Sequence, residues 1–159
     1  KEDKKKLDEF LLQEAYMDLF NEGQNVPWTG IGTYSSIEDN PFRAINYPDE
    51  NTTIIGGVRT LNKIDLTNWK YLHINVVGAL SRYGLDHRMY ITTNPDSVWH
   101  DSDAIYYSEV STAKEYNIFI GDINGEYYIK VLYRLAPNLV YASYSAGVAT
   151  RTYLSNTNL

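Results

Sequence analysis

The five residues Trp99-His100-Asp101-Ser102-Asp103 form the tightest group of side chains in the sequence that could do chemistry. Two carboxylates could contribute to a Ca²⁺ site, which takes about six to eight oxygen ligands, and an imidazole could bind Zn²⁺. The stretch lacks the glycine and glutamate positions of an EF-hand loop. We therefore interpret it as a solvated acidic loop and expect no metal and no other cofactor. Ca²⁺ at Asp101 and Asp103, or Zn²⁺ at His100, is the alternative.

Aromatic side chains near this stretch favour binding over catalysis. The chain has 15 tyrosines and 3 tryptophans, and such rings combine an apolar face with a polar tip, which suits ligand surfaces and stacking on sugar rings. Most of them are expected to be ordinary sheet residues. The predicted ligand-binding set combines aromatic residues of the loops with polar neighbours: Trp99, Tyr106, Tyr107, Tyr83, Arg82, His100, Asp101 and Asp103.

Catalytic signatures are weak throughout the sequence. No Gly-x-Ser-x-Gly segment is present, and none of His73, His87 and His100 is placed by a motif beside a serine. The absence of cysteine removes thiolate nucleophiles and thiolate metal sites. The spacing of the acidic residues does not single out a carboxylate pair for glycoside hydrolysis. We expect a protein that is not an enzyme, with a small hydrolase as an alternative.

Charge and hydropathy exclude two further classes of function. The formal net charge is −6, whereas a general nucleic-acid binder needs a basic surface to neutralise phosphates. No apolar run approaches the ~20 residues that a membrane-spanning helix requires. We expect neither nucleic-acid binding nor membrane insertion.

The N-terminal residues 3–22 have the periodicity of an amphipathic helix that ends at Gly23. Such a helix either docks on the rest of the chain or forms an oligomerising stalk. The residues predicted to face a partner chain in a stalk lie on one stripe: Leu7, Leu11, Ala15 and Leu19. Residues 1–24 are thus expected to form a helix, linker or oligomerisation segment.

Residues 25–159 have the pattern of an all-β domain, because turn residues separate short runs rich in Val, Ile, Tyr and Thr. Without interleaved helices, this predicts an antiparallel β-sandwich of the jelly-roll type. The longest connection, 94–114, contains a short predicted strand at 105–110. The seven other predicted strands lie near 32–38, 52–58, 70–78, 87–93, 115–120, 126–135 and 147–154.

The segment 121–134 shows the clearest alternation. Asn124-Gly125 is a turn signal, which predicts a hairpin. The odd-numbered positions from Tyr127 to Tyr133 are apolar or aromatic and predict a core wall. The even-numbered positions from Tyr128 to Arg134 are mixed and predict a surface for water, a partner chain or a ligand.

The phrase Ile64-Asp65-Leu66-Thr67, followed by Trp69 and an alternating strand, has a physical role of its own. Asp65 and Thr67 can bond local backbone groups and shape a turn, while Leu66 and Trp69 cap one end of the core. With the later strands 116–120 and 127–131, the phrase resembles β-sandwich modules of bacteriophage tail and virion structural proteins. The resemblance extends roughly over residues 52–154.

That resemblance implies a jelly roll similar to lectins and carbohydrate-binding modules. It implies a virion location, a homotrimeric receptor-binding or structural role, other virion proteins as partners, and host cell-surface polysaccharide as ligand. It assigns no binding residue. A carbohydrate-binding module of a bacterial secreted or cell-surface protein is the competing interpretation.

Overall fold

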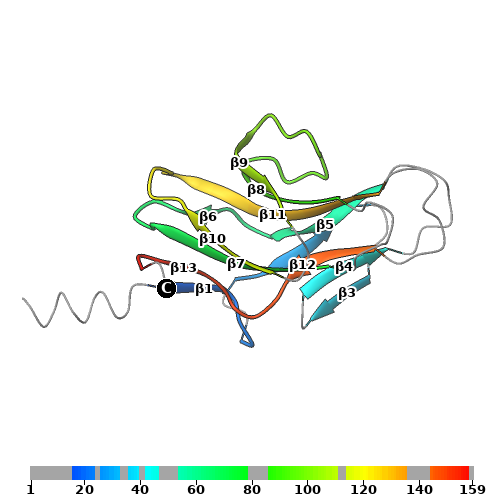
Figure 1. Cartoon of the computed structure of the whole chain (residues 1–159), viewed down its shortest axis with the longest axis horizontal. Helices are drawn as coiled ribbons and strands as arrows, with labels where there is room; N and C mark the ends of the chain where they lie inside the picture. Colours follow the sequence, from blue (N-terminus) through cyan, green and yellow to red (C-terminus); the bar gives the residue numbers. More distant parts are fainter. Residues whose placement is uncertain are drawn as a thin grey trace, which may run out of the picture.

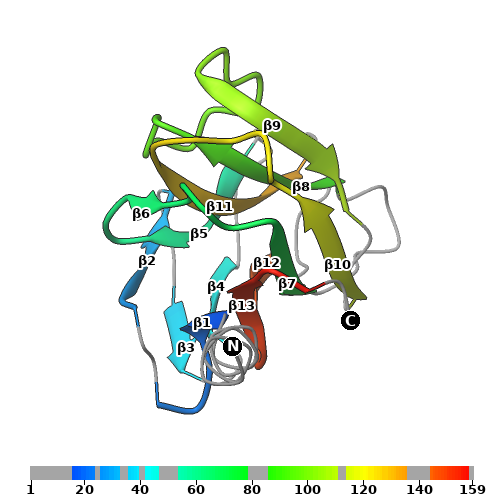
Figure 2. The same cartoon turned by 90° about the vertical axis from the view of Figure 1, so that its left-hand side faces the viewer.

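Two antiparallel β-sheets lie face to face and enclose a common core, as the computed structural model shows (Figures 1 and 2). The predicted all-β sandwich is therefore confirmed for the residues that the structure describes. Those residues contain no helix, so they contain no helix that could span a membrane. The described residues are 16–23, 26–32, 36–39, 42–46, 54–78, 86–110, 114–135 and 144–157.

The first sheet is built around β7, which is the lower layer in Figure 1. β10 pairs with one edge of β7, and β12 and β13 follow one another along the other edge. β1 extends the sheet beside β13, and β4 and then β3 extend it beside β12. The strands are β1 (Tyr16–Phe20), β3 (Ser36–Asp39), β4 (Phe42–Asn46), β7 (Tyr71–Val77), β10 (Lys114–Phe119), β12 (Tyr144–Val148) and β13 (Thr152–Ser155).

The second sheet is built around β11 and has the order β2-β5-β11-β8-β9. The short β6 pairs with the beginning of β11, on residues that precede those paired with β5. β8 and β9 form the outer edge, where the chain also makes its longest described connection. The strands are β2 (Trp28–Ile31), β5 (Ile54–Thr60), β6 (Ile64–Asp65), β8 (Asp86–Thr92), β9 (Ala104–Glu109) and β11 (Glu126–Leu135).

The core lies between the sheets and follows the predicted alternation. Leu72, Ile74 and Val76 of β7 are fully buried, as are Ile129 and Val131 of β11. Each such side chain stabilises the fold by about 1.5–3 kcal/mol. The predicted core faces of residues 70–78 and 126–135 are therefore confirmed.

The predicted N-terminal helix is wrong where the structure describes it, because Tyr16–Phe20 is strand β1. A register shift between Asp18 and Phe20 lets the adjacent residues Leu19 and Phe20 both reach the core. The indole nitrogen of Trp28 also donates to the Leu19 carbonyl at 2.9 Å. Leu19 is thus a core residue and not part of an oligomerisation stripe. The other residues of that stripe lie outside the described residues: Leu7, Leu11 and Ala15.

The predicted hairpin at 121–134 is also wrong. β10 belongs to the first sheet and β11 to the second, so the connection 120–125 crosses from one sheet to the other. Gly125 has the positive φ of 107° that its turn signal indicates. Its amide donates to Thr67 Oγ1 at 2.9 Å, and its carbonyl accepts from the Leu66 amide at 2.9 Å.

The Ile-Asp-Leu-Thr phrase has the predicted architectural role. The Thr67 amide donates to Asp65 Oδ1 at 3.0 Å, which closes the local turn. Leu66 is fully buried, and Trp69 packs partly buried against the core. The phrase therefore joins the turn before β7 to the turn before β11.

Candidate functional site

The loop 93–103 folds over the outer face of the second sheet, above β8 and β9 in Figure 1. Beneath it, Lys130 and Leu132 of β11 are fully buried, and Trp99 is only 3% exposed. Tyr90, Trp99 and Leu132 form an apolar cluster separate from the main core. The prediction of an open surface on the even-numbered side of β11 is therefore wrong at Lys130 and Leu132.

The ammonium group of Lys130 organises this loop. Its Nζ donates to the carbonyls of Asn94 at 3.1 Å and Asp96 at 2.8 Å, and to Asp101 Oδ2 at 3.1 Å. The Lys130 and Asp101 side chains are both completely shielded from solvent. Lys130 thus occupies the centre of a set of loop oxygens, the position that a structural cation would otherwise take.

The environment of Asp101 keeps its carboxylate ionised. Burial alone would raise the pKa of Asp101, but hydrogen bonds from Thr92 and Lys130 and the Lys130 charge outweigh it, so the pKa is lowered. Thr92 Oγ1 donates to Oδ2 at 2.7 Å, and the Asp103 amide donates to Oδ1 at 2.9 Å. Burial also lowers the pKa of Lys130, against the opposing effect of Asp101. Asp101 is therefore an anchor for the loop and not a proton donor.

These contacts also bear on the metal alternatives. Both oxygens of the Asp101 carboxylate accept hydrogen bonds from the chain itself, and Asp103 is exposed. Among the described residues, no three His, Asp or Glu side chains come together in a group that could hold a metal ion.

Trp99 is held from several sides. Its carbonyl accepts from the Tyr90 hydroxyl at 2.6 Å and from Arg88 Nη1 at 3.2 Å. The guanidinium groups of Arg88 and Arg134 each lie 4.7 Å from the centre of its indole ring. Burial raises the pKa of Tyr90 to about 12, so its hydroxyl remains a neutral donor. The indole is therefore part of a buried support under the loop and not an exposed stacking surface.

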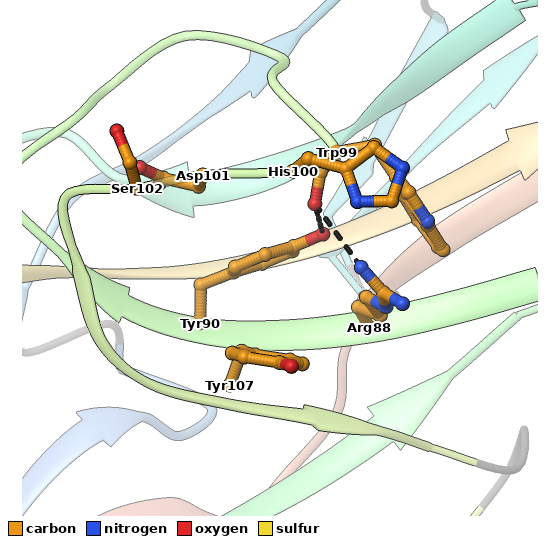
Figure 3. Close-up of a pocket in the computed structure, with 7 residues that line it drawn as sticks. All are labelled: Arg88, Tyr90, Trp99, His100, Asp101, Ser102 and Tyr107. Atoms are coloured by element: carbon orange, nitrogen blue, oxygen red, sulfur yellow. Dashed lines mark hydrogen bonds between the residues drawn. The ribbon is translucent and has the colours of Figure 1, made fainter.

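A pocket of about 390 Å³ lies beside this buried support, at the edge formed by β8, β9 and the loop (Figure 3). The Tyr107 side chain is 59% exposed, so its ring forms the solvent side of the pocket. Tyr90 and Tyr107 are cross-strand partners whose rings stack at 6.4 Å. The lining residues are Arg88, Tyr90, Trp99, His100, Asp101, Ser102 and Tyr107.

The structure brings together half of the predicted ligand-binding set. Four predicted residues line the pocket: Trp99, His100, Asp101 and Tyr107. Tyr106 lies on the other face of β9, partly buried against the main core, and does not line this pocket. Asp103 is exposed beside the pocket, and its amide supports Asp101. Arg82 and Tyr83 lie outside the described residues.

Sequence reasoning missed Arg88, Tyr90 and Ser102. Alternation along β8 was the available signal, because Arg88 and Tyr90 share the outward face. The register then places Tyr90 opposite Tyr107 and Arg88 opposite Glu109.

A second group of aromatic and polar side chains covers the outer face of the first sheet. Tyr153 stacks on His73 with ring centres 4.3 Å apart. The His73 ring lies between two polar side chains. Its Nδ1 contacts Asn117 Oδ1, and its Nε2 lies 2.7 Å from Ser155 Oγ. The order serine–histidine–amide has the composition of a catalytic triad.

The triad composition does not produce an accessible nucleophile. Ser155 is 4% exposed and His73 is fully buried. The Ser155 hydroxyl donates to the Thr157 carbonyl at 2.7 Å, so its proton points away from the imidazole. The group is therefore a buried polar network without an accessible nucleophile, and the pocket at Tyr107 is the stronger candidate site.

Comparison with known proteins gives information on the fold. No protein-family model and no curated protein matches the sequence. Among solved structures, the chain is similar to the glycoside hydrolase domain of Endo-D from Streptococcus pneumoniae R6, with a TM-score of 0.54 and 17% sequence identity. The match covers 86% of this chain and 23% of that one. This chain shares its fold with the matched part of the neighbour, and it spans about a quarter of the neighbour's length.

Proposed function

We propose that this β-sandwich is a non-catalytic saccharide-binding module whose site is the pocket between β8, β9 and the loop 93–103. The observation that carries the proposal is the exposed Tyr107 ring beside the polar groups of Arg88, His100 and Ser102. A sugar offers an apolar face to an aromatic ring and hydroxyl groups to hydrogen-bonding neighbours. The pocket volume of about 390 Å³ suits a small ligand, since such sites are about 300–1,000 Å³.

The buried residues that hold the loop beside the pocket are consistent with a binding role. Lys130 and Asp101 fix the loop, and Tyr90 fixes the Trp99 carbonyl. Side chains that are already held in place lose little conformational entropy when a ligand binds. The rigid side of the pocket therefore favours affinity, and the exposed Tyr107 supplies the contact surface.

The charge state of Asp101 supports binding over hydrolysis. Glycoside hydrolysis uses two carboxyl groups, and one of them is normally an acid with a raised pKa. Asp101 is the sole carboxylate among the residues that line the pocket. The pKa of Asp101 is lowered by its hydrogen bonds and by Lys130, despite the opposing effect of burial.

The structural neighbour gives the proposal a context. A chain of the same fold occurs within a larger glycoside hydrolase polypeptide, and a saccharide-binding module is one role that such a region can have. Fold alone does not specify function, so the proposal depends on the residues of the pocket. Two predictions remain for where this binding acts. One is a homotrimeric domain that attaches a phage particle to host polysaccharide, and the other is a module of a bacterial secreted or cell-surface protein.

Glycan binding by the purified chain tests the proposal. On a glycan array followed by calorimetry, Tyr107→Ala should weaken binding about tenfold, because an aromatic contact contributes about 0.5–1.5 kcal/mol beyond its area. Phe119→Ala is the matched control, since Phe119 is 56% exposed on the other sheet. Absence of binding to all glycans, or equal effects of the two variants, would overturn the proposal.

A further inference from the structure

The pair Asn124-Gly125 has chemistry that its role as a turn does not use. It is the sole Asn-Gly pair in the sequence, and the Asn124 side chain is exposed. The backbone nitrogen of the residue after an asparagine can attack the carbonyl carbon of the asparagine side chain. Glycine favours this attack, because it has no side chain to cover its nitrogen and its backbone is the least restricted. The pair is therefore suited to a covalent change that needs only water.

Two hydrogen bonds hold Gly125 directly before β11. Its amide donates to Thr67 Oγ1 at 2.9 Å, and its carbonyl accepts from the Leu66 amide at 2.9 Å. Thr67 is itself fixed by Asp65, because the Thr67 amide donates to Asp65 Oδ1 at 3.0 Å. Hydrogen bonds from the backbone and the side chain of Thr67 lower the pKa of the Asp65 carboxyl. The nitrogen that would attack Asn124 is thus bonded to a hydroxyl group that is held in place.

The bond to Thr67 opposes the attack. The Gly125 nitrogen reaches the Asn124 side chain only after it gives up its proton and turns away from Thr67 Oγ1. The turn must therefore open locally, at the free-energy cost of the contacts that close it. A turn on the surface opens more readily than the strands of the core do. The folded protein is consequently slow to react at this position, but not inert.

We propose that Asn124 is a site of spontaneous deamidation and that Thr67 limits its rate by holding the Gly125 amide. The Gly125 nitrogen forms a bond to Cγ of Asn124. The side-chain nitrogen takes up, in net terms, the proton that the Gly125 amide loses, and leaves as ammonia. Water then opens the resulting five-membered imide at one of its two carbonyl groups. One opening gives aspartate, and the other gives isoaspartate, whose main chain is longer by one methylene.

The product adds a carboxylate where the chain is already acidic. Asp65 and Glu126 are cross-strand partners in the pairing of β6 with β11, and both are exposed. Asp122 lies two residues before Asn124 and is also exposed. Like charges that face each other across a β-pair weaken it. Each deamidation adds one negative charge to the net charge of −6, so the modified protein holds this pairing less firmly.

Peptide mass spectrometry of protein aged at mildly alkaline pH tests the modification. Asn124 should deamidate much faster than Asn62, an exposed asparagine that precedes Lys63. Asn94 should stay intact, because it precedes Pro95, whose nitrogen carries no proton. Asn124→Gln should stop the reaction at this position, since the longer side chain would have to close a six-membered ring. Survival of Asn124 equal to that of Asn94 would overturn the proposal.

Two substitutions test the role of Thr67. Thr67→Val removes the hydroxyl and keeps the branched shape, whereas Thr67→Ser keeps the hydroxyl. Thr67→Val should deamidate about fivefold faster than the wild type, the factor that one ordinary hydrogen bond gives to a local opening equilibrium. Thr67→Ser should keep the wild-type rate. Hydrogen exchange of the Gly125 amide, measured on the same folded samples, should rise by the same factor in Thr67→Val. Equal deamidation rates in the two variants would overturn the control by Thr67.

Discussion

Nζ of Lys130 lies 3.1 Å from Oδ2 of Asp101, and both side chains are completely shielded from solvent. Lys130 comes from the middle of β11, while Asp101 comes from the loop that covers that strand. A buried ion pair adds little net stability compared with apolar side chains, but it requires a definite geometry. The pair therefore fixes where the loop lies, and with it the position of Trp99 and the pocket.

Removal of the Lys130 charge should destabilise the protein strongly. Lys130→Met leaves the Asp101 carboxylate buried without its counter-ion, which costs about 3–5 kcal/mol. Urea unfolding measures the loss. The double variant Lys130→Met, Asp101→Asn should recover part of it, because no uncompensated charge remains. Lys63→Met is the control, since Lys63 is exposed. An equal effect of Lys130→Met and Lys63→Met would contradict the role of the pair.

Calcium should leave the stability of the protein unchanged. The Asp101 carboxylate and two loop carbonyls already surround the Lys130 ammonium, so a divalent ion at the same oxygens would meet a positive charge. The thermal midpoint in excess CaCl₂ should therefore equal that in EDTA. A rise of the midpoint with Ca²⁺ that disappears in Asp101→Asn would show that the loop is a calcium site after all.

Sequence patterns predicted the centre of the fold better than its margins. The apolar residues that alternate along β7 and β11 follow from packing of one face of each strand against the main core, a local property that each strand carries in its own residues. The periodicity of residues 3–22 predicted a helix, but Leu19 and Phe20 are adjacent and both buried in β1. Pairing of β1 with β13, a strand from the far end of the chain, decides that outcome.

The sequence singled out the loop that borders the candidate pocket, but it did not predict the geometry of that pocket. The density of polar and aromatic residues marked the loop, yet the burial of Trp99 depends on Lys130 and Leu132 beneath it. Because lysine is rarely fully buried, the sequence alone predicts that the Lys130 side chain is exposed to solvent. Trp99 is consequently a support for the pocket, and Tyr107 is the exposed ring.

Acidification below pH 6.5 should weaken the fold through His87. The residue is 3% exposed, and its Nε2 donates to the Ser145 carbonyl at 2.8 Å, which links β8 to β12. Burial lowers the pKa of His87 from its usual 6.5, against smaller opposing effects of Ser145 and Asp86. Below that pH the unfolded chain binds a proton that the folded protein does not. The free energy of unfolding therefore falls as pH decreases, until the lowered pKa is reached.

Urea unfolding at pH 7.5 and pH 5.0 measures this dependence. His87→Gln preserves an N–H donor for Ser145 and removes the titrating imidazole. The variant should lose less stability than the wild type over the same pH interval. An identical pH dependence in the two proteins would show that His87 does not control it.

The His73–Ser155 contact should contribute to stability and not to catalysis. The Ser155 hydroxyl donates to the Thr157 carbonyl, and the residue is 4% exposed. A fluorophosphonate should therefore leave Ser155 unlabelled, as mass spectrometry would show. Ser155→Ala leaves the buried His73 nitrogen without a partner, which should cost about 1–3 kcal/mol in urea unfolding. Ser108→Ala, on the partly exposed edge strand β9, provides the control. Labelling of Ser155 that requires His73 would instead establish a working nucleophile on the first sheet.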